Sequence, residues 1–275
     1  MLDKIIGQDK IKDQLSRLFE IYIDSNCEIR PHFILTGQSG SGKTLLIKSL
    51  SEQFNVQFLE INAAQLTKEG MSGNSISKAL SPLLNYDLNK PLLVFVDEFD
   101  KLFITGNSND SMAQEYTVGV QNEFLKVIES SKTSVFGDYG KFVPVNTDKI
   151  LFVFVGTFNG EEGLTIPRLR EIGIKNEFLG RVSLLFHTEC LTLQDLKQIL
   201  IDSPLLNKYC DLYDYDDSKR DEIVNEISEE IERRNYNNNL GARMINTLIH
   251  QYFIQGEEFK EEKQFIPQRK SRVRK

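Results

Sequence analysis

One stretch of eight residues restricts the fold of this chain more than any other feature of its sequence. Residues 37–44 read Gly-Gln-Ser-Gly-Ser-Gly-Lys-Thr and directly follow the apolar run Phe33–Thr36. They directly precede a helical pattern that places Leu46, Leu50 and Phe54 on one face. An apolar strand, a glycine-rich loop and an amphipathic helix in this order predict a parallel sheet covered by helices, and thus an α/β fold.

The rest of the first half supports this fold, because short apolar runs alternate there with amphipathic stretches. Five runs lack polar alternation, as strands buried on both faces do. These predicted strands are Phe33–Thr36, Val56–Ile61, Leu92–Val96, Ile150–Val155 and Ser183–His187. Helices are predicted at Thr44–Phe54 and Val118–Ser130, a helix break near Leu80, and loops at Thr105–Glu115 and Gly137–Gly140.

After about Glu189 the pattern changes to helices alone. Thr192 is a predicted N-cap for a helix that runs to Ile201, and further helices are predicted at Asp216–Arg234 and Gly241–Ile254. The stretch Tyr209–Asp217 is expected to be a solvated acidic loop. We expect a large α/β domain over residues 1–190, a small all-helical domain over 191–262, and a basic, disordered tail over 263–275.

Composition excludes several classes of protein. The 275 residues are 40% apolar and 27% charged, the balance of a globular protein rather than of a disordered one. The longest apolar runs, such as Ile150–Gly156, are far too short to span a membrane, and the N-terminus lacks the apolar core of a signal peptide. Cys27, Cys190 and Cys210 fit neither a zinc site nor a disulfide framework, so we expect a cytoplasmic protein.

The net charge of −7 conceals an asymmetry. Five of the 33 Lys and Arg residues lie in Pro267–Lys275, which contains no acid. The first 266 residues therefore hold 28 cations against 40 Asp and Glu, a net charge of −12. The negative charge of these 266 residues would repel the phosphate backbone of a nucleic acid. Any binding of nucleic acid is therefore expected through the basic tail alone.

The glycine-rich loop carries the pattern G-x-x-x-x-G-K-[ST] between its strand and its helix, which is the context that a phosphate-binding loop requires. Glycines allow backbone N–H groups to curl around phosphate oxygens, and the helix N-terminus adds a positive dipole. Lys43 is predicted to reach the β- and γ-phosphates of ATP, and the Thr44 hydroxyl to bind Mg²⁺. The predicted nucleotide-binding residues here are Gly37, Gln38, Ser39, Gly40, Ser41, Gly42, Lys43, Thr44 and Leu45.

A pair of acids follows another predicted strand. Leu92–Val96 ends directly at Asp97 and Glu98. Side chains at the carboxyl ends of parallel strands lie at the edge of the sheet where ligands bind. We predict that Asp97 helps to hold Mg²⁺ and that Glu98 orients and deprotonates the attacking water as a general base. Together with the loop, the acids indicate an ATPase.

Further motifs resemble the AAA+ family of ATPases, and within it the ClpX-type unfoldases, over about Ile5 to Ile254. They occur in the order of the family and at roughly its spacing. They are Ile5-Ile6-Gly7-Gln8, Asp97-Glu98-Phe99-Asp100-Lys101, Val145–Phe152, Asn176-Glu177-Phe178-Leu179-Gly180-Arg181 and Leu240-Gly241-Ala242-Arg243. The resemblance implies a P-loop NTPase fold with a five-stranded parallel sheet between helices, followed by a small helical lid.

The resemblance also implies roles for particular residues. Ile5 and Ile6 match the entry motif that lines the adenine pocket. Arg181 matches the arginine finger that acts on the site of a neighbouring subunit, and Arg243 matches the sensor-2 residue of the lid. Either Thr157 or Asn159, which follow the sensor-1 strand, is expected to polarise the attacking water, and the sequence does not separate them.

Other features of such unfoldases are altered here. The segment that matches the substrate-gripping pore loop is Gly70, Met71, Ser72 and Gly73, where methionine replaces the usual aromatic residue. Tyr116 is a candidate for a second pore segment. An N-terminal zinc domain is not expected. Gly160–Lys175 lacks the Ile-Gly-Phe tripeptide, so docking to a ClpP-type peptidase is not expected either.

Three hypotheses follow. The first is an ATP-driven motor that assembles with itself as a ring, expected to be a hexamer, and remodels or unfolds a protein substrate, directly or through an adaptor. The second is a nucleotide-dependent switch or scaffold that does not thread substrate. The third is a nucleic-acid motor or loader. None involves a membrane.

Overall fold

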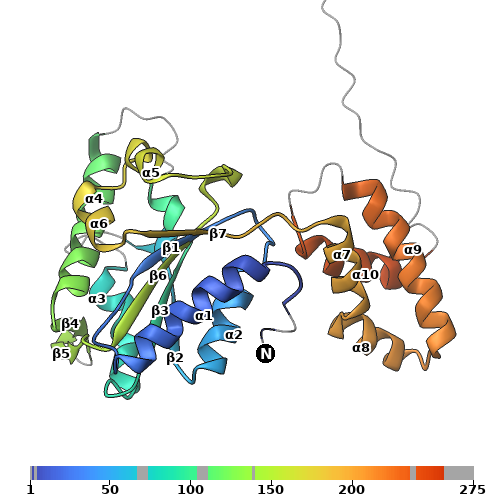
Figure 1. Ribbon diagram of the computed structural model, residues 1–275, viewed down its shortest axis with the longest axis horizontal. Coiled ribbons are helices and arrows are strands. Elements are labelled where there is room, and N and C mark those ends of the chain that lie inside the picture. The colour runs from blue at the N-terminus through green and yellow to red at the C-terminus, as the bar shows by residue number, and fades with distance from the viewer. Residues whose placement is uncertain are drawn as a thin grey trace, which may run out of the picture. The chain divides into compact units, whose positions relative to one another are not determined.

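The computed structural model describes residue 2 and residues 5–66, 74–103, 111–137, 140–235 and 240–256, with backbone alone at 111–116 and 235. The chain divides into two compact units, residues Met1–Leu191 and Thr192–Lys275, and each is described by itself (Figure 1). We call them unit 1 and unit 2.

Unit 1 is an α/β structure with a five-stranded parallel sheet, as predicted. The strand order is β2-β3-β6-β1-β7. The strands of this sheet are β1 (Phe33–Thr36), β2 (Gln57–Asn62), β3 (Leu92–Asp97), β6 (Ile150–Gly156) and β7 (Leu184–His187). The α-helices are α1 (Asp9–Asp24), α2 (Lys43–Gln53), α3 (Ile76–Ala79), α4 (Ser111–Glu129), α5 (Ile166–Ile172) and α6 (Asn176–Arg181).

Alternate residues of the central strands bury themselves in two separate cores, one on each face of the sheet. Along β6, Phe152 and Phe154 join the core that α4 and α6 cover, whereas Val153 and Val155 join the core under α1 and α2. Because both faces are covered, these strands read as continuous apolar runs. Tyr22 of α1 also donates a hydrogen bond to the carbonyl of Lys149 (2.6 Å), which fixes that helix against the sheet.

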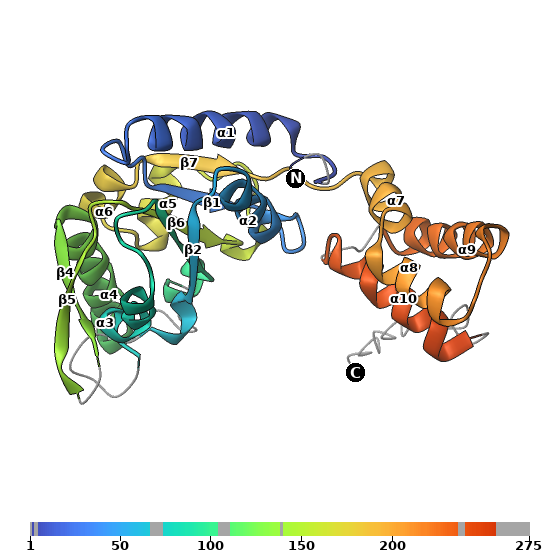
Figure 2. The same ribbon diagram turned by 90° about the horizontal axis from the view of Figure 1, so that it is seen from below.

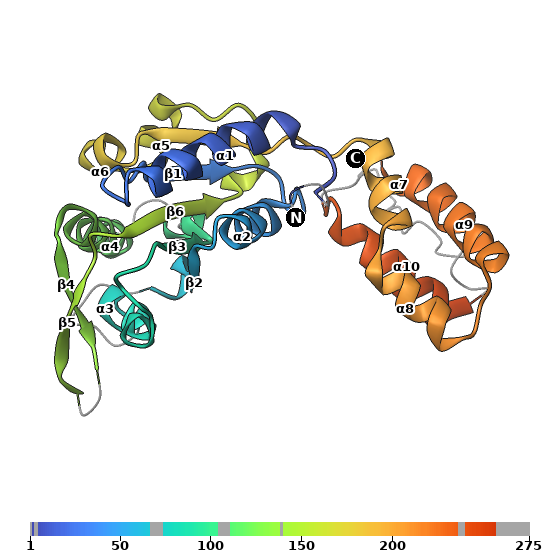
Figure 3. The same cartoon turned by 60° about the horizontal axis from the view of Figure 1, so that its bottom comes forward.

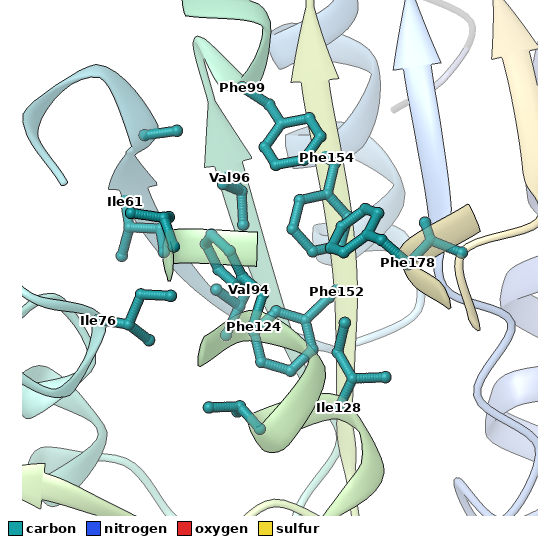
Figure 4. Packing of buried hydrophobic residues seen from close by; sticks show 14 of the residues in the cluster. Ile61, Ile76, Val94, Val96, Phe99, Phe124, Ile128, Phe152, Phe154 and Phe178 are labelled. Atoms are coloured by element: carbon teal, nitrogen blue, oxygen red, sulfur yellow. The ribbon is translucent and has the colours of Figure 1, made fainter. Parts of the chain in front are cut away.

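The core on the α4 side is built around a cluster of phenylalanine rings (Figure 4). Phe99 lies 4.8 Å from Phe154 and 5.4 Å from Phe178 between ring centroids, and Phe124 lies 5.2 Å from Phe154. All four side chains are fully buried. Phe99 follows the acidic pair directly, so this packing anchors the loop that presents Asp97 and Glu98.

A two-stranded antiparallel sheet of β4 (Lys132–Phe136) and β5 (Phe142–Asn146) lies beside α3 and α4 (Figure 2). The sequence predicted a loop at its tip but not the strands. The expected loop at Thr105–Glu115 was wrong in part, because α4 begins at Ser111. Met112, Ala113, Gln114 and Glu115 tolerate a helix well, which extends the predicted helix toward its N-terminus.

In the part of unit 2 that the structure describes there are four α-helices, which surround a small apolar core. Figure 3 shows how these helices lie side by side. They are α7 (Leu193–Ile201), α8 (Pro204–Leu212), α9 (Asp217–Asn235) and α10 (Arg243–Gln255). Thr192 and Asp195 form a capping box at the start of α7, as the predicted N-cap requires. The acidic loop predicted from Tyr209 was wrong in part, because Tyr209–Leu212 belongs to α8, which Ser203 and Pro204 start.

None of the helices in the described ranges is both long and apolar enough to cross a membrane.

The stability of unit 1 should fall in mild acid because of His32. This side chain is buried, and its Nδ1 accepts a hydrogen bond from the backbone N–H of Phe152 (3.0 Å). Burial, with a smaller contribution from Arg30, lowers the pKa of His32 from 6.5 to about 3. The unfolded chain therefore binds a proton that the folded chain does not, and the stabilisation is lost as pH falls from 6.5 toward 3.

We expect the free energy of unfolding to decrease by up to about 2 kcal/mol between pH 7 and pH 5 through this residue. Urea denaturation of the wild type and of His32→Gln at both pH values measures it. The decrease should be smaller in His32→Gln, and an equal decrease in both proteins would contradict the assignment.

Candidate active site

The carboxyl ends of three neighbouring strands bring the predicted site residues of unit 1 to one edge of the sheet. β6 lies between β1 and β3, with Thr36 paired to Gly156 and Val96 paired to Phe154. The glycine-rich loop leaves β1, the sensor-1 residues follow β6, and the acids follow β3. This parallel register, which no single motif encodes, is what assembles the site.

The loop itself is held by unusual backbone angles and by its own lysine. Gly37, Gly40 and Gly42 have φ angles of 145°, 72° and 90°, which a side chain would strain. Lys43 Nζ donates hydrogen bonds to the carbonyls of Gly37 (2.8 Å) and Gln38 (2.7 Å), so the ammonium lies within the loop. Gly42 is the N-cap of α2, which places the positive end of the helix at the loop.

A layer of polar side chains supports the loop from below. Ser41 Oγ lies 2.6 Å from Thr188 Oγ1 at the end of β7. The buried Gln8 amide donates to the carbonyl of Glu189 (2.7 Å) and accepts from its N–H (2.8 Å), and it also donates to the carbonyl of Ser41 (3.4 Å). Gln8 therefore joins the entry segment, the loop and the last strand.

The acidic pair lies next to an amide on the neighbouring strand. Asn62, which pairs with Asp97 in the sheet, donates from Nδ2 to Glu98 Oε2 (3.1 Å). Glu98 has φ 54°, a strained backbone that turns its side chain out of the strand direction. Burial raises the pKa of Asp97, partly countered by the hydrogen bond from the Glu98 N–H and by the charge of Lys43.

The turn after β6 is fixed by a buried carboxylate. Asp100 Oδ2 accepts hydrogen bonds from the Thr157 hydroxyl (3.2 Å) and from the Phe158 N–H (3.1 Å). Phe158 and Asn159 both have positive φ angles, and the Phe158 ring is buried. Thr157 is therefore engaged below the turn, whereas Asn159 is exposed on it. The geometry places both candidates at the edge that carries the loop and the acids.

Arg181 lies at the opposite edge of the sheet. It is the last residue of α6, and its Nε donates to Glu129 Oε1 at the end of α4 (2.7 Å). Both side chains are about half exposed. They line a cleft of about 540 Å³ together with Glu28, Arg30 and His32.

The other predicted residues take varied positions. Ile5 is buried in the core under α1 and α2, Ile6 is half-buried, and Leu45 is 57% exposed. Arg243 is the exposed first residue of α10 in unit 2. The candidate pore residues Gly70, Met71, Ser72 and Gly73 lie outside the described residues. Tyr116 belongs to α4, and its side chain is likewise outside them.

These residues fit a nucleoside triphosphate and its metal ion. An ammonium held inside a glycine-rich loop at a helix N-terminus is a cradle for phosphate oxygens. The Thr44 hydroxyl, which follows Lys43 directly, and the Asp97 carboxylate are oxygen ligands of the kind that Mg²⁺ prefers.

Comparison with known proteins agrees with this geometry. The model of the ATPase family associated with various cellular activities (AAA) matches residues 33–170. This range spans β1, the glycine-rich loop, the acidic pair, the turn after β6 and most of α5. The chain belongs to this family, and it binds and hydrolyses ATP.

The similar curated proteins include several named ATP-dependent Clp protease ATP-binding subunit ClpX. That of Bacteroides thetaiotaomicron is 28% identical, over 89% of this chain and 72% of its own length. That of Porphyromonas gingivalis is 30% identical, over 82% of this chain and 60% of its own length. A protein of Wolinella succinogenes, named ClpX 2, is 29% identical over 91% and 73%. The recognition of a ClpX-like AAA+ ATPase is thereby confirmed.

Four residues contact predicted functional residues or their loops in ways that the sequence did not predict: Gln8, Asn62, Asp100 and Glu129. Gln8 and Asp100 belong to the motifs on which the resemblance rests, but the sequence assigned no role to either residue. Asn62 directly follows the predicted strand Val56–Ile61, and a polar residue at that position is a signal for the edge of the sheet. Glu129 carries no local signal, since its partner Arg181 is 52 residues away.

Substituting Gly37 should disable nucleotide binding through sterics alone. A Cβ at this position would lie 1.9 Å from Thr188 Oγ1, and its φ of 145° disfavours any side chain. We expect Gly37→Ala to weaken binding of a fluorescent ATP analogue by at least about tenfold, which is roughly 1.4 kcal/mol. Gly163→Ala is the matched control, because Gly163 also has a positive φ but has open space around its Cβ position. Equal affinities of the two variants would contradict this account.

Proposed function

We propose that the chain assembles with copies of itself into a ring, in which each ATP site is completed by the neighbouring chain, and that ATP hydrolysis there remodels a protein partner. The position of Arg181 is the observation that best supports ring assembly. Arg181 precedes the first residue of β7, whereas the loop follows the last residue of β1, and the two strands pair in parallel. A four-residue strand alone separates such ends by roughly 13 Å. Arg181 therefore lies far from the loop of its own chain, which supports a role for it at the site of a neighbouring chain.

Within one chain, the residues divide the chemistry of hydrolysis. Lys43 binds phosphate oxygens of ATP, and Glu98 orients a water molecule and takes its proton. Asn62 restrains the Glu98 carboxylate, since its amide donates a hydrogen bond to Glu98 Oε2. Thr44 and Asp97 would hold Mg²⁺, which when bound neutralises charge on the phosphates. Thr157 or Asn159 contacts the attacking water from the middle strand.

The neighbouring chain supplies the remaining charge. Its Arg181 stabilises the negative charge that develops on the transferred phosphoryl group. In a single chain Glu129 pairs with this guanidinium, so the pair must open when two chains meet. The pair is exposed and weak, at most about 1 kcal/mol, so its opening does not oppose assembly strongly. A separate role falls to Arg243, which belongs to the helical unit 2. Its proposed role is to sense the state of the nucleotide.

The protein partner is inferred from relatives. They are ATP-binding subunits of an ATP-dependent protease, and the chain matches them over both units. The first 266 residues are also acidic, which disfavours contact with nucleic acid. Protein remodelling therefore fits this chain better than a nucleic-acid motor does. Gly70–Gly73 remains our candidate for the substrate loop. Docking to a ClpP-type peptidase is not proposed, because Gly160–Lys175 lacks the Ile-Gly-Phe tripeptide.

Two substitutions should separate binding from chemistry. Glu98→Gln removes the base but leaves the loop intact, so it should bind ATP with near wild-type affinity and lose at least about 10²-fold in turnover. Lys43→Ala removes the cation inside the loop and should lose binding itself. Nucleotide affinity and phosphate release measure the two effects. Turnover that persists in Glu98→Gln would remove Glu98 from the role of base.

Mixing two inactive variants should restore hydrolysis if the finger acts between chains. Arg181→Ala chains keep Glu98, and Glu98→Gln chains keep Arg181, so a mixed ring contains sites with both groups. We expect the phosphate-release rate of an equimolar mixture to exceed that of either variant well above additivity. A mixture that is merely the average of its components would contradict action in trans, provided that both variants still assemble by sedimentation.

A further inference from the structure

The ends of α8 and α10 in unit 2, with the loop that follows α8, carry four aromatic side chains that the nucleotide site does not use. Tyr209 and Phe253 are stacked, with ring centroids 4.3 Å apart and planes 5° apart. Tyr213 lies 5.7 Å from Phe253 at an angle of 10°, and Tyr215 lies 5.6 Å from Tyr213 at 20°. We call these four near-parallel rings the aromatic stack.

The aromatic stack is open to solvent on the side of the loop that follows α8. Tyr213 is 48% and Tyr215 40% exposed, and the chain neighbours Leu212 and Ile254 are 71% and 74% exposed. These side chains leave apolar surface exposed to water on a small helical unit, and covering that surface would be favourable. It is therefore a surface on which a partner would gain stability.

The charge around the stack selects the kind of partner. Tyr209–Asp217 contains four aspartates, all exposed, and no cation. The two cations that follow this stretch in sequence already have partners. Lys219 forms an ion pair with Glu222. Arg220 donates hydrogen bonds to the Asn207 side chain and to the carbonyl of Ile201. Flat aromatic faces bordered by carboxylates bind guanidinium and ammonium groups, through cation–π contacts and ion pairs.

One segment of this chain has the complementary composition. Pro267–Lys275 holds five cations and no acid, and it lies outside the described residues. α10 ends at Gln255, two residues after Phe253 of the stack. The fourteen residues from Gly256 to Arg269 can span up to about 45 Å, so the segment can reach the stack of its own chain. A linker of this length raises the effective concentration to about the millimolar range, at which weak contacts suffice.

We propose that residues 267–275 dock on the aromatic stack of the same chain. Their Arg side chains lie against the rings of Tyr213 and Tyr215, and their cations pair with the aspartates of Tyr209–Asp217. The basic segment is then an internal ligand of unit 2 that covers its exposed aromatic face. This docking is independent of the nucleotide site and of ring assembly.

Zero-length carbodiimide cross-linking of the full chain tests the proposal directly. The reagent joins the amines of Lys270 and Lys275 to carboxylates in contact with them, and mass spectrometry locates the products. We expect the products to concentrate on the aspartates of Tyr209–Asp217 and to fall several-fold at high salt, which screens exposed pairs. Mixing isotope-labelled and unlabelled chains separates joining within one chain from joining between two.

The variant Tyr213→Ala/Tyr215→Ala keeps every carboxylate that can be joined, so loss of these products reports loss of docking. We expect at least a fivefold decrease in it, and none in Phe142→Ala, which removes an exposed ring from unit 1. Products spread evenly over the acids of the chain, unchanged in the double variant, or found only between labelled and unlabelled chains would overturn the proposal.

A second measurement does not depend on the fold of the double variant. The full chain with Gln at Arg269, Lys270, Arg272, Arg274 and Lys275 leaves the stack without its internal ligand. A fluorescent synthetic peptide of residues 267–275 should bind this variant at least tenfold more tightly than it binds the wild type, whose own segment competes. Equal binding to the two chains would overturn the proposal.

Discussion

The parallel pairing of β6 between β1 and β3 is the constraint on which the rest of unit 1 depends. It brings the ends of three strands to one edge, although the residues that follow them are some 60 or more positions apart in sequence. The pairing holds because alternate residues of β6 are buried in two different cores. A slip of one residue would exchange those cores, which is costly when both faces are packed. The site thus inherits its precision from apolar burial.

Polar contacts then fix the side chains and loops at this edge. Lys43 is held by carbonyls of its own loop, Glu98 by Asn62, and the turn after β6 by Asp100. Each contact restrains a side chain or a turn whose backbone angles or buried charge are unfavourable on their own. The strained residues Glu98 and Phe158 lie where phosphate chemistry is expected, which agrees with the concentration of strain at functional sites.

Much of this arrangement could be predicted from sequence, for physical reasons that differ between its parts. The sheet was readable because strands buried on both faces lack polar alternation, and the phosphate loop because few other patterns combine glycines, lysine and a helix start. The β4–β5 pair was missed because Lys132–Phe136 alternates only weakly. The start of α8 was missed although Ser203 and Pro204 signal it. Contacts such as Gln8 with Glu189 depend on tertiary packing, and no local pattern announces them.

We propose that one chain holds an incomplete ATP site, which a second chain completes. This proposal is tested most directly by the rate of phosphate release per chain, measured against chain concentration with the mass of the assembly determined by sedimentation under the same conditions. The rate per chain should be low for single chains and rise together with the mass as rings form. A rate per chain that stays constant from single chains to the assembled state would contradict the claim.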